Sequence, residues 1–305
     1  MLFEFHMHRF SILILAVALW VALPRSVGAG KGVSYKFQHY KEGDDRVDVI
    51  AHYASAQVDL STAAKLSIVG LVDVITGATP TGATPDEGSE QVPLARLEDT
   101  RYAGMVDFEH AIGDGAIRAE YAYSHESDYI SNGLSIGLSH DFNKRNTTVR
   151  LQFAYTDDDI QPGFFDTPRN KLSRDLLVGI TQLLGPNTVI TANLSYGNID
   201  GYLSDPYKIV SKTVEIVPGF PLKLSFPENR PDHREKWVGY LEGQHMFEAV
   251  RGSIDVSGRY YTDDHGVDSG TLEVAWFQRF GERWIVRPSL RWYRQSAADY
   301  YHFDL

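Results

Sequence analysis

Residues 147–156, TTVRLQFAYT, alternate between apolar and polar side chains. Val149, Leu151 and Phe153 fall on one face of an extended chain, and Arg150 falls on the other. Because successive side chains of a β-strand point to opposite sides, this period of two predicts a strand with one apolar and one polar face.

The same period recurs along most of the chain, and no segment shows a sustained helical period. The predicted strands are bounded by Gly, Asp, Asn, Pro and Ser, which favour turns. They cover residues 33–40, 47–59, 65–75, 100–111, 115–124, 130–142, 147–156, 171–184, 187–197, 235–247, 251–262, 269–280 and 283–294. The predicted fold class is therefore all-β.

Alternation alone fits two architectures. In a soluble sandwich the apolar face packs on a second sheet, and the polar face meets water. In a transmembrane barrel the apolar face meets lipid, and the polar face lines the lumen.

The lengths of the connections distinguish the two. Short connections are predicted at 60–64, 112–114, 143–146, 185–186, 248–250 and 281–282. The connections between them are equal or longer, at 41–46, 76–99, 125–129, 157–170, 198–234 and 263–268. Outer-membrane barrels alternate short periplasmic turns with longer extracellular loops, so we predict a single antiparallel transmembrane β-barrel of the outer-membrane type.

The N-terminus predicts export. Residues 10–23 are apolar except for Ser11, Arg9 precedes them, and the small residues 27–29 follow. This order is typical of a cleaved signal peptide, so we assign residues 1–29 to the signal and residues 30–305 to the barrel. The chain has no cysteine, which excludes disulfides and thiolate chemistry. Its net charge of −11 argues against nucleic acid as a partner.

The strand count predicts a further C-terminal segment. About 13 strands are visible, and single-chain bacterial barrels close with an even number. We therefore expect 14 or 16 strands in the complete product, with the C-terminal strand or strands missing after Leu305.

Several motifs resemble a family of Gram-negative outer-membrane barrels that is catalogued as a domain of unknown function, number thirty-five seventy. The matching stretches are TGATPTGA at 76–83, HESDY at 125–129, DFNKRNTT at 141–148, YTDDD at 155–159, GYLSDPYK at 201–208, GVDS at 266–269 and QSAADYY at 295–301. The resemblance spans the chain from about residue 33 to its end. It implies an outer-membrane barrel and no assigned activity.

Acidic residues gather at the predicted outer ends of the strands. Hard oxygen ligands at close spacing suit calcium, which makes these acids a candidate cation site. The alternative is a solvated acidic rim that faces lipopolysaccharide, next to interfacial tyrosines. The candidate residues are Glu126, Asp128, Asp157, Asp158, Asp159, Asp263, Asp264 and Asp268.

Charges of both signs are predicted on the lumen face. In a wide pore they set ion selectivity, whereas in a narrow barrel they pair across the interior and close it. The proline-rich loop 198–234 is predicted either to fold inward as a constriction or to stand outward as a lid. The predicted lumen charges are Arg101, Asp107, Glu109, Arg118, Glu120, Arg150, Asp255, Arg259, Glu273, Arg287 and Arg291.

Three functions follow as hypotheses. The first is a porin-like conduit for small polar solutes, located in the bacterial outer membrane. The second is a non-conducting structural or binding barrel whose acidic rim holds divalent cations, lipopolysaccharide or a partner. The third is an enzyme at the rim, which we do not expect, because no histidine outside the predicted signal peptide stands in a catalytic or metal-binding motif. We expect no cofactor other than rim calcium, and as partners only membrane lipid, lipopolysaccharide and the barrel-assembly machinery.

Overall fold

The computed structural model describes residues 31–43, 47–80, 88, 93–162, 165–217 and 220–300. The predicted signal peptide lies outside the described residues. The strands are β1 (Lys31–Lys41), β2 (Val47–Asp59), β3 (Ala64–Pro80), β4 (Leu94–Ile112), β5 (Gly115–His125), β6 (Tyr129–Phe142), β7 (Thr147–Ile160), β8 (Arg169–Gly185), β9 (Thr188–Gly201), β10 (Ile209–Val217), β11 (Phe220–Pro227), β12 (His233–Phe247), β13 (Gly252–Asp263), β14 (Asp268–Phe280), β15 (Trp284–Val286) and β16 (Ser289–Gln295).

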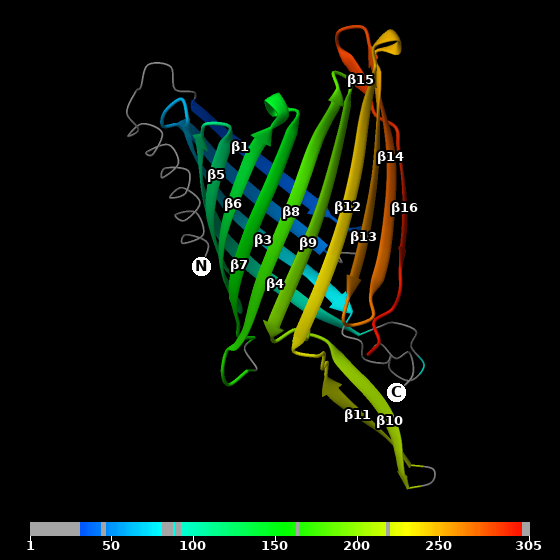
Figure 1. Cartoon of the computed structure of the whole chain (residues 1–305). Helices are drawn as coiled ribbons and strands as arrows, with labels where there is room; N and C mark the ends of the chain where they lie inside the picture. The colour runs from blue at the N-terminus through cyan, green and yellow to red at the C-terminus, as the bar shows by residue number, and fades with distance from the viewer. Residues whose placement is uncertain are drawn as a thin grey trace.

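One 14-stranded antiparallel sheet contains all of these strands except β10 and β11. Its strands pair in chain order from β1 to β9, then continue through β12, β13 and β14, and both β15 and β16 pair with β14. The sheet curves round on itself as in a barrel (Figure 1). The predicted all-β antiparallel sheet is thus confirmed. Among the described residues the sheet is not closed, because β1 pairs with β2 and the other edge ends at β15 and β16.

The predicted alternation of connections also holds. Tight turns join β2 to β3, β4 to β5, β6 to β7, β8 to β9, β12 to β13 and β14 to β15. The tight turn between β4 and β5 requires a positive φ, and Gly113 adopts a φ of 61° there without steric strain. The longest connection of the sheet, between β9 and β12, lies at the opposite end from these turns (Figure 1).

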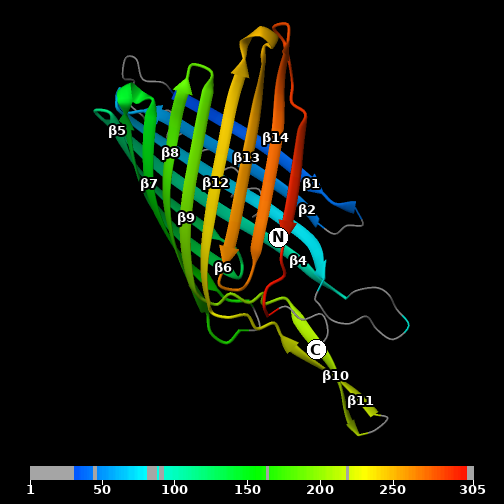
Figure 2. The ribbon, with the colours of Figure 1, turned by 45° about the vertical axis from the view of Figure 1, so that its right-hand side comes forward.

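The long connection contains two strands where the sequence pattern predicted none. Within it, β10 and β11 form an antiparallel hairpin from Ile209 opposite Pro227 to Val217 opposite Phe220. The prolines of this segment argued against strands, because Pro cannot donate a backbone hydrogen bond. In a two-stranded hairpin, however, both strands are edge strands, and edge strands tolerate Pro. Figures 1 and 2 both show the hairpin projecting from the end of the sheet and away from its interior.

The thirteenth predicted strand, 283–294, is divided into β15 and β16. The break falls at Pro288, whose nitrogen has no hydrogen to donate to the neighbouring strand. Its carbonyl still accepts from the backbone N–H of Trp276 at 3.0 Å, so the chain stays in register with β14.

The apolar face of the sheet points outward. Leu151 is 43% exposed, Phe153 is 47% exposed and Leu290 is 76% exposed. Among the described residues the buried apolar set is small by comparison and contains Ala51, Val58, Val72, Ile160, Pro162, Val267 and Ala275. An apolar surface of this extent needs lipid rather than water, as the alternation predicts. The described residues contain only short helical turns, and none has the length and apolar composition of a membrane-spanning helix.

Candidate functional site

The inner face of the sheet carries ion pairs between adjacent strands. Asp73 of β3 and Arg101 of β4 are direct cross-strand partners. The Arg101 guanidinium donates from Nε at 3.1 Å and from Nη2 at 2.6 Å to the two carboxylate oxygens of Asp73. Asp73 is only 3% exposed, so the hydrogen bonds from Arg101 replace the hydration that its carboxylate loses on burial.

The same arrangement recurs on other strands. Asp107 of β4 is buried and accepts from Arg118 of β5 at 2.5 Å. Arg118 also lies 3.6 Å from Glu120 of its own strand. Asp158 of β7 is buried and lies 3.0 Å from Lys171, which is its cross-strand partner on β8. The pairs therefore run along the wall instead of crossing the interior.

One pair crosses a strand because a glycine leaves room for it. Lys236 of β12 reaches over β9 to Asp175 of β8, with an Nζ–Oδ1 distance of 3.0 Å. Gly197 of β9 lies between them in the register. A Cβ at Gly197 would come within 2.1 Å of Lys236 Cε and 2.4 Å of Asp175 Oδ1, so a larger residue would displace the two side chains from this ion pair.

The remaining predicted lumen charges are paired more loosely. Arg287 lies 3.2 Å from Glu273, and Asp255 accepts from the Gln244 amide at 3.2 Å. Arg291 lies over the ring of Tyr293 at 6.0 Å. The other members, Glu109, Arg150 and Arg259, are half-buried or exposed, and Arg259 lies over the ring of Tyr261 at 5.8 Å.

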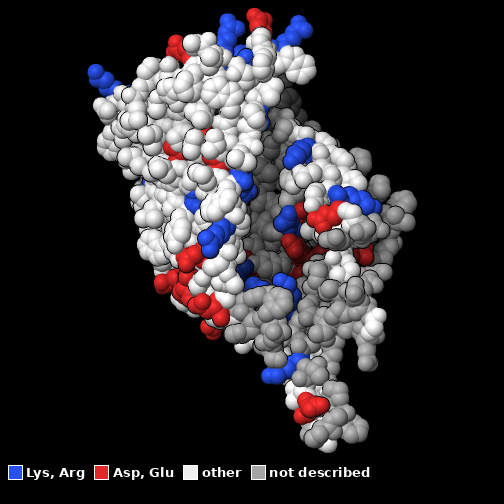
Figure 3. Space-filling model, turned by 90° about the vertical axis from the view of Figure 1, so that its right-hand side faces the viewer, with Lys and Arg blue, Asp and Glu red and all other residues white. Residues whose placement is uncertain are grey.

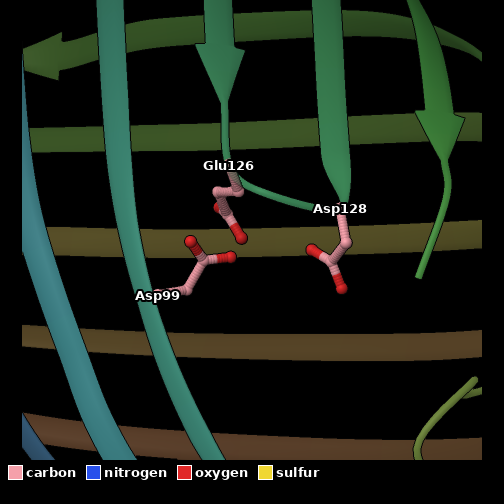
Figure 4. A group of neighbouring side chains, drawn as sticks. All are labelled: Asp99, Glu126 and Asp128. Atoms are coloured by element: carbon pink, nitrogen blue, oxygen red, sulfur yellow. The ribbon is translucent and has the colours of Figure 1, made fainter. Parts of the chain in front are cut away.

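The long-loop end of the inner face holds a group of three carboxylates. Asp99 of β4, Glu126 of the β5–β6 turn and Asp128 of the same turn each offer an oxygen, and these oxygens lie within 4.8 Å of one another. Figure 4 shows the three side chains pointing toward one another. The sequence predicted Glu126 and Asp128 as site residues, and the structure brings these two together with Asp99.

Hydrogen bonds fix two of the three carboxylates. Asp99 accepts from the Ser127 hydroxyl at 2.8 Å and from the Ser127 backbone N–H at 3.2 Å. Asp128 accepts from the phenol of Tyr207, which lies in the long β9–β12 connection. Burial raises the pKa of the Tyr207 phenol, and the charge of Asp128 raises it further, so this phenol stays protonated and donates.

Glu126 is the least compensated of the three. The Arg101 guanidinium lies 4.0 Å away, beyond hydrogen-bond distance. Burial raises the pKa of Glu126, Arg101 lowers it, and the nearby charges of Asp99 and Asp128 raise it again, for a net increase. Three carboxylates at this separation repel one another, and a bound cation would relieve that repulsion.

The other predicted rim acids do not join this group. β7 continues to Ile160, so Asp157, Asp158 and Asp159 lie on a strand and not on a loop. Consecutive strand residues face opposite sides, and these three therefore cannot converge on one ion. Asp158 is held by Lys171, as described above, and Asp159 accepts from the Asn170 amide at 2.5 Å.

The predicted acids at the end of β13 and the start of β14 also do not converge on one point, because each is held by a different donor. Asp263 accepts from the guanidinium of Arg234 and from the hydroxyl of Tyr261 at 2.6 Å. Asp268 faces the other side and accepts from Tyr260 at 2.8 Å. Asp264 accepts from the backbone N–H of Glu235 at 2.9 Å.

Sequence reasoning missed Asp99 because it placed the start of the fourth strand at residue 100. β4 begins at Leu94, so Asp99 shares the inward parity of Arg101. Extending the alternation backward from Arg101 would have found it. Asp73 was missed although it lies within the predicted strand 65–75. Val72 and Val74 flank it, and the segment as a whole is apolar, so it did not show a clear polar face.

Charged side chains line a groove on one side of the molecule. Figure 3 shows the side that bears β14 and β16 in Figure 1, where the groove runs along the molecule with basic and acidic side chains on its walls. On this side, charged side chains on the groove walls are therefore exposed at the surface.

A family model described as "Protein of unknown function (DUF3570)" matches residues 21–170 and 164–303. No curated protein matches the chain in sequence.

Solved outer-membrane proteins resemble the chain weakly. The alcaligin outer membrane receptor FauA from Bordetella pertussis has 11% identity and a TM-score of 0.47, with 89% of this chain and 57% of the receptor covered. The COG4313 outer membrane channel from Pseudomonas putida F1 has 12% identity and a TM-score of 0.42, with 90% and 97% covered. OmpT, an outer membrane protein of Vibrio cholerae, has 10% identity and a TM-score of 0.38, with 87% and 96% covered. The chain spans less than two thirds of the length of the receptor.

Proposed function

The chain belongs to the DUF3570 family of proteins of unknown function, and from the geometry of its inner face we propose that it is a passive outer-membrane conduit for small polar solutes. The observation that carries the proposal is the direction of the ion pairs. Asp73–Arg101, Asp107–Arg118 and Asp158–Lys171 each join neighbouring strands. Charges neutralised along the wall leave the centre of the lumen to water, whereas pairs across the interior would close it.

The hairpin of the long connection supports the same function. β10 and β11 pair only with each other and project away from the interior (Figures 1 and 2). Of the two predictions for loop 198–234, an inward constriction and an outward lid, the outward one agrees with the position of β10 and β11. At the base of the loop, Tyr207 instead reaches the β5–β6 turn and donates to Asp128. A solute path along the inner wall is therefore not filled by β10 and β11.

Conductance in a planar bilayer tests the proposal. We expect stable ohmic steps from the refolded chain, with folding checked by heat-modifiable gel mobility. Arg150→Glu reverses a charge on the inner face and should shift the reversal potential toward cation preference. Arg145→Glu makes the same charge change at a tight turn, where the side chain is 71% exposed, and should leave selectivity unchanged.

Two outcomes would refute the conduit. One is silence from a chain shown to be folded. The other is an equal shift of selectivity in both variants, because that would reflect net charge and not a charged path.

A second function is proposed for the three carboxylates, namely binding of a divalent cation such as calcium at the long-loop end. The observation that favours it is the convergence of Asp99, Glu126 and Asp128 from two elements. Calcium takes six to eight oxygens, so water or a further group would complete the shell. We expect calcium to raise the midpoint of thermal unfolding and a chelator to lower it.

Asp128→Asn tests this second function, with Asp157→Asn as the matched control on the outward face. The stabilising effect of calcium should be lost in the first variant and kept in the second. Equal calcium responses in the two variants would show that the ion binds elsewhere, for example at lipopolysaccharide.

A further inference from the structure

A second charged site lies on the inner face at the long-loop end, formed by β12, β13, β14, β16 and the connection around β10 and β11. It is a cavity of about 790 Å³. Its basic lining residues are Lys208, Arg230, Arg234 and Arg259, and its one acidic lining residue is Glu228. Most of the charged residues that line the cavity are therefore basic, in contrast to the carboxylate group of β4 and the β5–β6 turn.

Three of the four cations already have a carboxylate partner. Arg234 donates from Nε to Asp263 at 2.9 Å. Asp263 also accepts from the backbone N–H groups of His265 and Val267, each at 3.0 Å, which holds Arg234 in place. Arg234 thus lines the cavity in a fixed position, and its charge is already neutralised by Asp263.

The other two pairs lie in the long connection. Arg230 donates to Glu228 at 2.9 Å, and Lys208 lies 3.6 Å from Asp205. The Nε of Arg230 is nonetheless buried and has no hydrogen-bond partner among the described residues. The Arg230 side chain as a whole is 30% exposed, so its charge contributes to the lining although its Nε is covered.

Arg259 is the cation left without a carboxylate. Within the described part of the chain its guanidinium contacts the ring of Tyr261 at 5.8 Å and forms no ion pair. It is the direct neighbour of Thr271 and Tyr240 in the sheet, and neither is acidic. A planar guanidinium with free N–H groups suits a bidentate oxyanion.

Aromatic rings complete the cavity. Tyr261, Tyr293 and Tyr300 line it together with the cations. Its volume falls within the range of small-molecule sites, about 300–1,000 Å³. Rings of this kind stack on a planar ligand. The hydroxyls of Tyr261 and Tyr293 already donate to Asp263 and Gln295, which fixes the positions of the two rings.

We propose that this cavity binds small organic anions in which a phosphate or carboxylate group is attached to a ring. The anionic group contacts Arg259, the Arg230 guanidinium adds a second positive charge to the cavity wall, and the ring packs on the tyrosines. The proposal rests on the conduit function in that the ligand enters as a solute of the lumen, and it names the class of solute. Binding itself is measured in detergent, without a membrane.

Calorimetric titration of the folded chain with phenyl phosphate, inorganic phosphate and phenol tests the proposal. We expect phenyl phosphate to bind more tightly than phosphate, and phenol to bind least. Arg259→Gln should weaken binding of phenyl phosphate about tenfold, as expected for loss of one charged hydrogen-bonding group. Arg150→Gln removes an inward arginine outside the cavity and should leave the affinity unchanged.

Arg259→Lys provides a second variant, because it keeps the positive charge and removes the planar guanidinium group that binds an oxyanion in a bidentate way. It should bind with intermediate affinity. Wild-type affinity in Arg259→Gln, or an equal loss in Arg259→Gln and Arg150→Gln, would overturn the assignment. Equal affinity of wild type for phosphate and phenyl phosphate would overturn the role of the tyrosines.

The inference and the conduit function fail separately. Binding without conductance would overturn the conduit and support the anion site. Conductance without binding of phenyl phosphate would support the conduit and overturn the anion site.

Discussion

Replacing Arg101 by Gln should destabilise the fold strongly, because it leaves a buried carboxylate without its cation. Asp73 is 3% exposed and receives two hydrogen bonds from Arg101, at 3.1 and 2.6 Å. Removing one partner of a buried pair costs about 3–5 kcal/mol. The Arg101 side chain is 36% exposed, so water reaches part of the pair, and we expect a loss of about 2–3 kcal/mol.

The assay is urea unfolding in lipid vesicles, with the folded fraction read from gel mobility. Arg150→Gln is the matched control, since Arg150 is an inward arginine on the exposed part of β7, and surface changes of this kind stay within about 0.5 kcal/mol. The double variant Asp73→Asn with Arg101→Gln removes the stranded charge and should recover more than half of the loss.

The reasoning would be refuted if Arg101→Gln cost no more than the control. It would also be refuted if the double variant were as unstable as the sum of the two single variants, because the two side chains would then be independent.

Two further predictions concern Gly197 and Glu126. Gly197→Ala places a Cβ 2.1 Å from Lys236 Cε and should destabilise the fold by about 1–3 kcal/mol, whereas Gly239→Ala, which has nothing within 4 Å, should be close to neutral in the same urea titration. A loss in both variants would point to strand propensity instead of the ion pair. The raised pKa of Glu126 means that the folded state holds its proton more tightly than the unfolded state. Stability should therefore fall as pH rises from the ordinary glutamate pKa through the raised value, and Glu126→Gln should remove this slope; an unchanged slope would place its origin elsewhere.

Much of the candidate site could be predicted, and the missing part has a definite cause. Alternation assigned Arg101, Asp107 and Arg118 to the inner face, because the period of two is set by the backbone and needs no tertiary information. It missed Asp99 because a strand end is defined by pairing with its neighbour, and β4 continues to Leu94 through contacts with β3. The sequence pattern also placed Asp157 to Asp159 on a loop. The structure extends β7 to Ile160 because these residues pair with β6 and β8.

By itself the sequence determined the fold class, the order of the strands, the outward apolar face and the alternation of short and long connections. These properties follow from local periodicity and turn chemistry. Only the tertiary structure decided which charges meet. Lys236 reaches Asp175 across Gly197, and Arg259 has no carboxylate partner among the described residues, because register and strand length set these distances. Distances between residues far apart in the chain depend on how strands pair, and composition does not contain that information.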